Sequence, residues 1–374
     1  MRPLVILHTE SSSGWGGQEM RVISEVVGML GRGHRVMLAC RRGSEIARRA
    51  REKNIETYIM SLHGAFDIAG IRRVRAFLRR REVDIVNTHS SKDSWCAGFA
   101  ARLSGDVKVV RTRHLSIPVK RSFETRLLYG SLHDTVVTAG ETLRRHIIER
   151  VDLDPARVLS IPTGIDLDAF DPDRVTGSAF RDEIGADDTN PVIGSVGMLR
   201  HMKGHSYLIE AAASVLQEYP QARFVLAGDG PSAGALRERL SARASELGIA
   251  DKFLMLGYRE DIPEVMAGLD VFVHPSIGYE GVPQVVSQAM AMRRPVVATD
   301  VGAVCEQVVN GRTGILVEKA NSRQLAQGIL TVLKNPDTAA RMGENGRRLV
   351  EDRYSLDTML DETERLYARL LSED

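Results

Sequence analysis

Cysteine is scarce in this sequence, and long apolar runs are absent. The 374 residues include three cysteines, Cys40, Cys96 and Cys305, at no spacing typical of a disulfide framework or a zinc site, which favours a reducing compartment. No segment approaches the roughly 20 apolar residues that span a bilayer, and the opening run Pro3–Leu7 is too short for a signal-peptide core. We therefore expect a cytoplasmic protein that is not integral to a membrane.

Signatures of several other functions are missing as well. The three-glycine dinucleotide fingerprint is absent, and the second predicted strand ends in Cys40-Arg41-Arg42 without an acidic residue, which argues against a nicotinamide cofactor. No Asp-x-Asp has ligand-like surroundings, so we expect no metal and no cofactor. No aromatic-lined basic groove is evident, so nucleic acid is not an expected partner.

The chain does have a globular composition with an uneven distribution of charge. Hydrophobic residues make up 43% and charged residues 26%, and a chain of this length is expected to form two domains. Residues 1–165 carry 28 Lys and Arg against 17 Asp and Glu, whereas residues 166–374 carry 22 against 32. The net charges of +11 and −10 indicate either that the first half meets an anionic partner or that the two halves attract one another.

Short apolar runs alternate with amphipathic segments along the whole chain. The alternation predicts an α/β protein with two doubly wound, Rossmann-like parallel-sheet domains facing a central ligand cleft. The Pro- and Gly-containing segment 160–166 separates the two series, so we predict domains over 1–165 and 166–354 and a final helix within 355–374. The predicted strands are Leu4–His8, Arg35–Ala39, Ile85–Asn87, Val107–Arg111, Thr135–Thr138, Pro191–Val196, Ala222–Ala227, Phe253–Leu256, Val271–His274, Pro295–Ala298 and Gly314–Val317.

Two loops at predicted strand ends have the composition of anion sites. Gly16 and Gly17 lie between a strand and a helix, where backbone N–H groups can approach a phosphate. A tight turn explains these glycines equally well. Arg200 and Lys203 lie in a loop between a strand and a helix that begins near Ser206. These two side chains could neutralise a diphosphate, and a solvated basic loop is the alternative.

The segment 271–301 is the richest in candidate site residues. Glu280 stands in a Gly- and Pro-containing loop after a strand. Its carboxylate could hold sugar hydroxyls by hydrogen bonds, or it could cap the following helix. Gln288 lies eight positions further on, and its amide could both donate to and accept from a ribose diol.

Several motifs, in their order and spacing, resemble those of the retaining family-four glycosyltransferases of GT-B fold. Each motif is a weak pattern alone, but the ordered set is specific and extends over nearly the whole chain. The motifs are Gly197…Lys203-Gly204, Gly228-Asp229-Gly230-Pro231, His274-Pro275-Ser276, Glu280-Gly281-Val282-Pro283, and Ala289-Met290-Ala291 followed by Pro295–Thr299.

The resemblance implies roles for the candidates. Gly16, Gly17 and Gly228 would lie at the nucleotide-sugar donor, and Lys203, aided by Arg200, would bind its diphosphate. The remaining roles concern the donor sugar. Glu280 would hold its hydroxyls, the backbone after Glu280 would orient it, and His114 would lie near the reacting centre, with His89 a weaker candidate. The catalytic set is thus His114, Glu280 and Lys203, and the backbone positions after Glu280 are Gly281, Val282 and Pro283.

Two positions depart from the family pattern. Met198 stands where the family usually has an arginine, and Arg200 is the nearest substitute. Gln288 replaces a second glutamate, although its amide can still bond a ribose, so we expect donor binding to be kept. Neither departure touches the three implied catalytic residues.

The resemblance also implies the reaction. We expect a metal-independent hexosyltransferase in which the leaving diphosphate accepts the proton of the incoming hydroxyl on the same face, so that the protein mainly positions groups and stabilises charge. A UDP-sugar is the preferred donor and GDP-mannose the next. The expected acceptor is a glycan or lipid-linked hydroxyl in bacterial surface-polysaccharide or lipopolysaccharide synthesis. The alternatives are a GT-B nucleotide-sugar epimerase and a non-enzymatic two-domain nucleotide-sugar binding protein.

The first domain, which takes the acceptor in this fold, carries a basic segment over 71–81. Read as a helix, the segment has an apolar stripe opposite a face of arginines. Either the stripe packs on the sheet beneath solvated arginines, or the basic domain docks peripherally on the inner face of an anionic membrane. The family pattern further implies that the final helix packs back on the first domain. The stripe consists of Ile71, Val74, Phe77 and Leu78.

Overall fold

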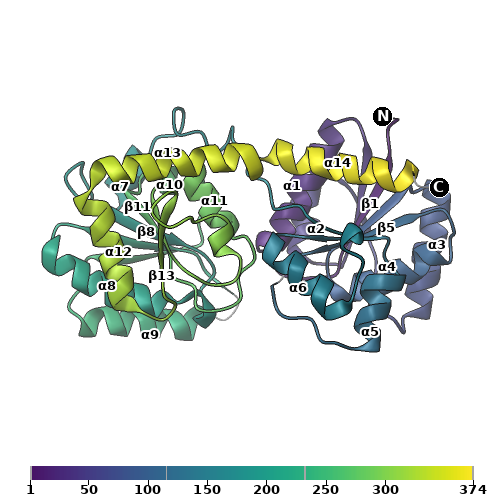
Figure 1. The fold of residues 1–374 in the computed structure, drawn as a ribbon, viewed down its shortest axis with the longest axis horizontal. Helices are drawn as coiled ribbons and strands as arrows, with labels where there is room; N and C mark the ends of the chain where they lie inside the picture. The colour runs from purple at the N-terminus through teal and green to yellow at the C-terminus, as the bar shows by residue number, and fades with distance from the viewer. Residues whose placement is uncertain (1, 115, 231–232, 373–374) are drawn as a thin grey trace. The chain divides into compact units, whose positions relative to one another are not determined.

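A computed structural model describes residues 2–114, 116–230 and 233–372, so the motif position Pro231 and the last two residues of the predicted final segment lie outside the described part. The chain divides into two compact units, coloured by residue number in Figure 1. Unit 1 comprises Met1–Gly164 and Leu356–Asp374, and unit 2 comprises Ile165–Ser355. Each unit contains one parallel sheet covered by helices, as the alternating pattern predicts.

Unit 1 is built on a seven-stranded sheet in the order β3-β2-β1-β4-β5-β6-β7. All neighbouring strands are parallel. The winding direction reverses between β1 and β4, so the loops after these two strands flank a topological switch point. The elements are β1 (Val5–Glu10), α1 (Gly17–Gly31), β2 (Arg35–Cys40), α2 (Glu45–Glu52), β3 (Glu56–Ile59), α3 (Ile68–Arg81), β4 (Ile85–Thr88), α4 (Ser91–Arg102), β5 (Lys108–Arg113), α5 (Phe123–Arg126), η1 (Leu127–Ser131), β6 (Thr135–Thr138), α6 (Glu141–Val151), η2 (Pro155–Arg157), β7 (Val158–Ser160) and α14 (Leu356–Ser372).

Alternating side chains of β1 explain the two helical layers of unit 1. Ile6 packs in a core formed with α1, α2 and α14, whereas Leu7 packs in a second core formed with α3 and α4. A strand buried on both faces in this way needs apolar residues at successive positions. The central strand therefore reads as a short continuous apolar run.

The end of the chain completes the core of unit 1. Helix α14, drawn in yellow, lies against α1, drawn in purple (Figure 1). Leu360 packs beside Gly28 of α1, where a Cβ atom would overlap it. The Tyr367 hydroxyl donates to a carboxylate oxygen of Glu25 at 3.3 Å and accepts from Asn87 Nδ2 at 3.0 Å. Contacts far apart in sequence thus hold the final helix in place.

Unit 2 is built on a six-stranded parallel sheet in the order β10-β9-β8-β11-β12-β13. Its winding direction reverses between β8 and β11, which places a second switch point there. The elements are α7 (Ser178–Glu183), β8 (Val192–Val196), η3 (His201–Lys203), α8 (His205–Glu218), β9 (Arg223–Ala227), α9 (Ala233–Glu246), β10 (Phe253–Gly257), α10 (Ile262–Ala267), β11 (Val271–His274), α11 (Gln284–Ala291), β12 (Val296–Thr299), η4 (Val304–Glu306), β13 (Gly314–Val317), α12 (Ser322–Lys334) and α13 (Pro336–Arg353).

All the predicted strands are present, and two strands were not predicted. β3 and β7 lie at the two edges of the unit 1 sheet. β3 is half-exposed and ends in an exposed residue, and β7 is only three residues long. An edge strand has a neighbour on one side only and needs little apolar sequence, so neither produced a recognisable run.

The basic segment of the sequence forms helix α3, and its apolar stripe is buried. The four stripe residues pack in the core beneath the sheet, with Leu78 fully buried. Arg72, Arg73, Arg79 and Arg80 are exposed on the other face. The stripe therefore packs on the sheet and is not available to a membrane. Among the helices of the described residues, none combines the length and apolar character needed to cross a bilayer.

Candidate active site

Lys203 and Glu280 meet at the switch point of unit 2. Lys203 ends the short helix η3 in the loop after β8, and Glu280 lies in the loop after β11, the strand beside β8. The Lys203 ammonium lies 2.6 Å from Glu280 Oε1 as a part-buried ion pair. The two side chains are 25% and 12% exposed. The loops of adjacent strands thus bring together a cation suited to a diphosphate and a carboxylate suited to sugar hydroxyls.

Two glycines permit the close approach of these loops. Gly204, directly after Lys203, has φ +68, and a Cβ atom there would overlap the carbonyl oxygen of Pro275 in the β11 loop. Gly302 has φ +58, and a Cβ atom there would overlap the carbonyl oxygen of Glu280. Both positions combine a left-handed backbone with a lack of room, so a side chain at either would push the loops apart.

Glu280 is held as a carboxylate by its neighbours. Ser276 donates a hydrogen bond to Oε1, and His274 Nε2 lies 3.5 Å from the same atom. Burial raises the pKa of Glu280, but His274 and Lys203 outweigh burial and hold that pKa well below its usual range. The capping alternative for Glu280 is wrong, because Pro283 is the N-cap residue of α11. His274 and Ser276 belong to one of the motifs that resemble the family, but no role was predicted for them from the sequence. Their position at the end of β11 was the available indication that they belong to the site.

The other unit 2 candidates follow strands β8, β9 and β11, on the carboxyl side of the same sheet. Arg200 is the exposed N-cap residue of η3, and Gly228 follows β9, with its N–H donating to the Gly257 carbonyl at 2.6 Å. Gln288 lies on α11 and is 8% exposed. His205 Nε2 donates to the carbonyl of Met198 at 3.1 Å, which braces the loop at the position where the sequence departs from the family pattern that it resembles. The chain after Glu280 runs through half-buried Gly281 and buried Val282 and Pro283.

The glycine loop of unit 1 is organised by a buried carboxylate. Gly16 is the N-cap residue of α1 and Gly17 its first residue. Glu10, at the end of β1, is fully buried and accepts from the Ser12 backbone N–H at 2.7 Å and from Gln18 Nε2 at 2.6 Å. These bonds fix the loop at both ends. Glu10 was not predicted, although a charged residue at a strand end was the available signal.

A second buried carboxylate, Asp93, lies beside Glu10. Asp93 Oδ2 accepts from the Thr9 hydroxyl at 2.9 Å and from the His89 backbone N–H at 3.0 Å. It also accepts from the Ser90 backbone N–H at 3.2 Å in the capping box of α4. Burial and the neighbouring Glu10 carboxylate raise the pKa of Asp93 to about 7. The two carboxylates tie β1 to the start of α4 across the switch point.

His114 and His89 meet in unit 1. His114 follows β5 and His89 follows β4, and His114 Nε2 lies 3.0 Å from His89 Nδ1. Burial, reinforced by neighbouring positive charges, holds the pKa of both imidazoles well below the usual range. The two histidine candidates of unit 1 are thus in contact with one another, as Lys203 and Glu280 are in unit 2.

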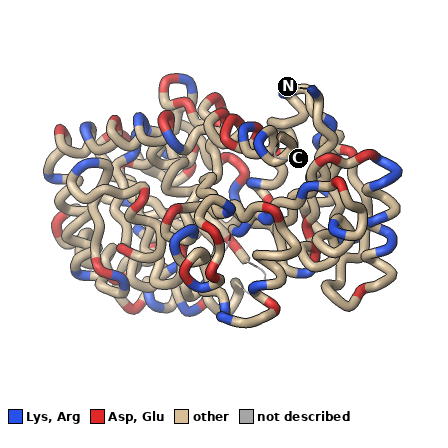
Figure 2. Tube along the Cα trace, turned by 45° about the vertical axis from the view of Figure 1, so that its right-hand side comes forward, with Lys and Arg blue, Asp and Glu red and all other residues tan. Residues whose placement is uncertain are grey.

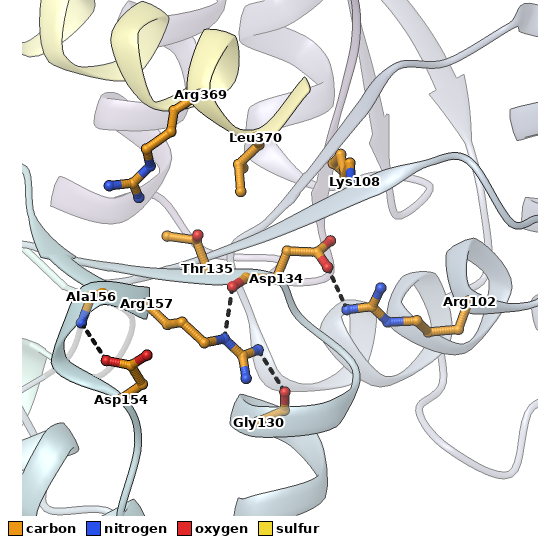
Figure 3. Close-up of a pocket in the computed structure, with 10 residues that line it drawn as sticks. All are labelled: Arg102, Lys108, Gly130, Asp134, Thr135, Asp154, Ala156, Arg157, Arg369 and Leu370. Atoms are coloured by element: carbon orange, nitrogen blue, oxygen red, sulfur yellow. Dashed lines mark hydrogen bonds and ion pairs between the residues drawn. The ribbon is translucent and has the colours of Figure 1, made fainter. Parts of the chain in front are cut away.

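A hollow of about 540 Å³ in unit 1 lies away from these residues. Lys108 and Thr135, which line it, begin β5 and β6, so the hollow is at the amino edge of the sheet. Its arginines hold the chain around β6: Arg102 donates to Asp134 at 2.8 Å, and Arg157 Nε donates to the Asp134 carbonyl at 3.0 Å (Figure 3). This hollow is therefore part of the scaffold, and the candidate site is at the opposite edge.

Comparison with known proteins identifies the family. Two models match in succession: Glycosyltransferase Family 4 over residues 15–169, and Glycosyl transferases group 1 over residues 178–349. A D-inositol 3-phosphate glycosyltransferase of Corynebacterium efficiens is 30% identical over 296 residues, covering 73% of this chain and 68% of the relative. The chain belongs to the family-four glycosyltransferases. It is a retaining enzyme that uses a nucleotide-sugar donor, and the membership decides against the epimerase and binding-protein alternatives.

Two further proteins are similar to this glycosyltransferase. A UDP-Gal:alpha-D-GlcNAc-diphosphoundecaprenol alpha-1,3-galactosyltransferase of Escherichia coli is 26% identical over 80% of this chain and 79% of its own. An Anabaena protein solved with UDP-glucose superposes with a TM-score of 0.83 at 22% identity, covering 99% of this chain and 100% of that one. The fold is GT-B, as the sequence resemblance predicts. Within the described residues, no group of three or more His, Cys, Asp or Glu is placed to hold a metal ion.

Proposed function

We propose that this glycosyltransferase transfers a hexose from a UDP-sugar to a hydroxyl of a glycan or lipid-linked acceptor in bacterial surface-polysaccharide or lipopolysaccharide synthesis. The observation that carries the proposal is the Lys203–Glu280 pair at the switch point of unit 2, at 2.6 Å. Unit 2 is the donor domain in this proposal, and unit 1 takes the acceptor. The uracil base is supported by two similar proteins, the Escherichia coli enzyme named for UDP-Gal and the Anabaena protein solved with UDP-glucose. GDP-mannose is the second candidate.

In the proposed reaction, charge stabilisation is the main task of the protein. Lys203, with Arg200, stabilises the negative charge that develops on the leaving diphosphate. Glu280 holds sugar hydroxyls as an ionised acceptor, which its low pKa allows at neutral pH. The backbone around Gly16, Gly17 and Gly228 contacts the donor without side chains, and the leaving diphosphate itself accepts the proton of the acceptor hydroxyl. The residues assigned to orienting the donor are Gly281, Val282, Pro283 and Gln288, with His114 at the reacting centre.

The donor is tested by calorimetric titration with UDP, GDP, ADP and dTDP in EDTA. We expect one nucleotide, UDP, to bind at a single site, and Lys203→Met to weaken it by at least about tenfold, or about 1.4 kcal/mol. Lys252→Met is the matched control, because it removes the same charge before β10 at the opposite edge of the unit 2 sheet. Preference for GDP would redirect the proposal to GDP-mannose, and a requirement for Mg²⁺ or Mn²⁺ would contradict metal-independent transfer.

We also propose that unit 1 docks on the inner, anionic face of the cell membrane, where a lipid-linked acceptor would be found. The buried stripe of α3 rules out insertion of that helix. Two connections at the carboxyl edge of the sheet, the loop before α3 and the loop that leads into α5 after β5, nevertheless carry exposed large apolar side chains. Phe66, before α3, is 99% exposed, and Phe123, after β5, is 77% exposed. Exposed arginines of α3 accompany the first loop; Figure 2 shows the charged positions along the trace. Exposed apolar side chains on a basic domain suit an anionic bilayer surface.

Membrane docking is tested by co-sedimentation with phosphatidylglycerol and with phosphatidylcholine vesicles. We expect binding to the anionic vesicles alone, reduced in the Phe66→Ser and Phe123→Ser variants. Leu103→Ser is the matched control, since Leu103 is 57% exposed at the amino edge of the sheet. Equal binding by all three variants would assign the attraction to net charge and remove the two loops from the proposal.

A further inference from the structure

Three histidines from the ends of three adjacent strands form a continuous chain in unit 1. His8 lies on β1, His89 follows β4 and His114 follows β5. His8 Nδ1 lies 2.9 Å from His89 Nε2, and His89 Nδ1 lies 3.0 Å from His114 Nε2. His8 and His89 are 0% and 3% exposed, whereas His114 is partly exposed. The chain therefore runs from the core to the residue assigned to the reacting centre.

Burial favours the neutral form of each of the three rings, which has one N–H group. Burial lowers the pKa of His8, His89 and His114, and the positive charges around the chain, Arg21 and Arg111, act in the same direction on His89 and His114. In each contact between two neutral imidazoles, one nitrogen donates and the other accepts. The direction of donation at one end of the chain therefore determines the tautomer of every ring.

The buried carboxylate of Glu25 lies at the His8 end and favours one direction of donation. His8 Nε2 lies 3.9 Å from Glu25 Oε1, and a carboxylate attracts an N–H group and repels a lone pair. The same oxygen accepts from Asn87 Nδ2 at 3.1 Å and from the Tyr367 hydroxyl of α14 at 3.3 Å. Arg21 Nε lies 3.6 Å from the other carboxylate oxygen. Glu25 is thus held in place from three elements.

We propose that His8 and His89 are positioning residues that orient His114 and hold it as the Nε2–H tautomer, with Nδ1 as a hydrogen-bond acceptor for a substrate hydroxyl. With the proton of His8 on Nε2, His8 Nδ1 accepts from His89 Nε2–H, and His89 Nδ1 accepts from His114 Nε2–H. The remaining lone pair of His114 is then on Nδ1. The role of His114 Nδ1 as an acceptor for a substrate hydroxyl rests on the proposed function, because it requires His114 to lie at the donor sugar. The tautomer of His114 does not depend on the proposed function.

The tautomer is measured directly in the unmodified protein. Long-range ¹H–¹⁵N correlation spectra of protein with ¹⁵N-labelled histidine distinguish protonated from unprotonated ring nitrogens, and a His114→Gln variant assigns the signals. At pH 7.5 we expect His114 to be neutral with Nδ1 unprotonated. A His114 that carries its proton on Nδ1, or on both nitrogens, overturns the proposal, and the variant serves only to assign the signals.

Variants at His89 separate positioning from mere structure. His89→Leu should turn His114 into a mixture of tautomers and lower kcat for UDP-sugar transfer by about tenfold or more, with the Kd for UDP changed less than about twofold. His89→Gln keeps one donor and one acceptor and should recover most of kcat. His63→Leu is the control, because it removes an exposed histidine that is not one of the three connected histidines. Unchanged kcat or an unchanged tautomer in His89→Leu overturns the proposal; an absence of transfer in the unmodified protein refutes the proposed function instead, and the spectra still decide the tautomer.

Discussion

Replacing Glu280 with glutamine should tighten the binding of free UDP while it impairs transfer. The Lys203 ammonium is paired with Glu280 at 2.6 Å. A nucleoside diphosphate must therefore compete with a carboxylate for the lysine, and must approach that carboxylate's negative charge. Glu280→Gln removes both penalties and keeps the size and hydrogen-bonding capacity of the side chain.

The expected magnitude follows from the burial of the pair. Exposed ion pairs contribute about 0–1 kcal/mol, whereas breaking a buried pair costs about 3–5 kcal/mol. With side-chain exposures of 25% and 12%, Lys203 and Glu280 lie between these limits. Release of the lysine should then improve UDP affinity by about 1–2 kcal/mol, or about 5- to 30-fold in Kd. Transfer should fall by about 100-fold or more, because a charged group that holds the sugar is lost.

Calorimetric titration of UDP and single-turnover transfer in EDTA measure the two effects separately. Glu238→Gln is the matched control, since Glu238 lies exposed on α9. Lys203→Met should lose UDP affinity, and the double variant should resemble it, because the carboxylate can no longer restrain an absent lysine. If Glu280→Gln weakened UDP as Lys203→Met does, Glu280 would be supporting the nucleotide, and the competition argument would be refuted.

Three further predictions concern stability. Gly204→Ala should lower the free energy of unfolding of unit 2 by about 2–3 kcal/mol in chemical denaturation, because φ is +68 and Cβ would overlap the Pro275 carbonyl oxygen; a fully stable variant would show that the loops can separate without cost. Tyr367→Phe should cost about 1–2 kcal/mol, because buried Glu25 loses a donor; denaturation at pH 7.5 measures this, and an unchanged midpoint would contradict it. Acid should destabilise unit 1, because its buried histidines have lower pKa values in the folded state than in the unfolded state. Their contribution to the free energy of unfolding is present above about pH 6.5 and is lost as the pH falls below that value. The loss is up to about 1.4 kcal/mol for each histidine by pH 5.5. Asp93, whose pKa is raised to about 7, gains a proton in the folded state over the same range and offsets part of the loss. Chemical denaturation at pH 7.5 and at pH 5.5 measures the net effect, and a more stable unit 1 at pH 5.5 would refute the prediction. These histidines are His8, His89 and His133.

The sequence by itself determined the layered α/β architecture and the family. Every predicted strand overlaps an observed one and begins at most one residue before it, because central strands buried on both faces require apolar runs, and such runs are readable. The missed strands, β3 and β7, are edge strands. The helical spacing predicted the apolar stripe of α3. It could not predict whether the stripe packs on the sheet or contacts a membrane, because both environments favour the same apolar residues.

The sequence also indicated which residues carry the chemistry, since loops at the carboxyl ends of parallel strands are where such sheets bind ligands. It could not show that Lys203 and Glu280 pair, or that Pro283 and not Glu280 caps α11. That pairing depends on β8 lying beside β11, a fact of sheet order. The histidine chain has the same origin, because β1, β4 and β5 are neighbours in space although helices separate them in sequence. Residue types and local spacing are written in the chain, whereas contacts between loops arise only when the strands take their order in the sheet.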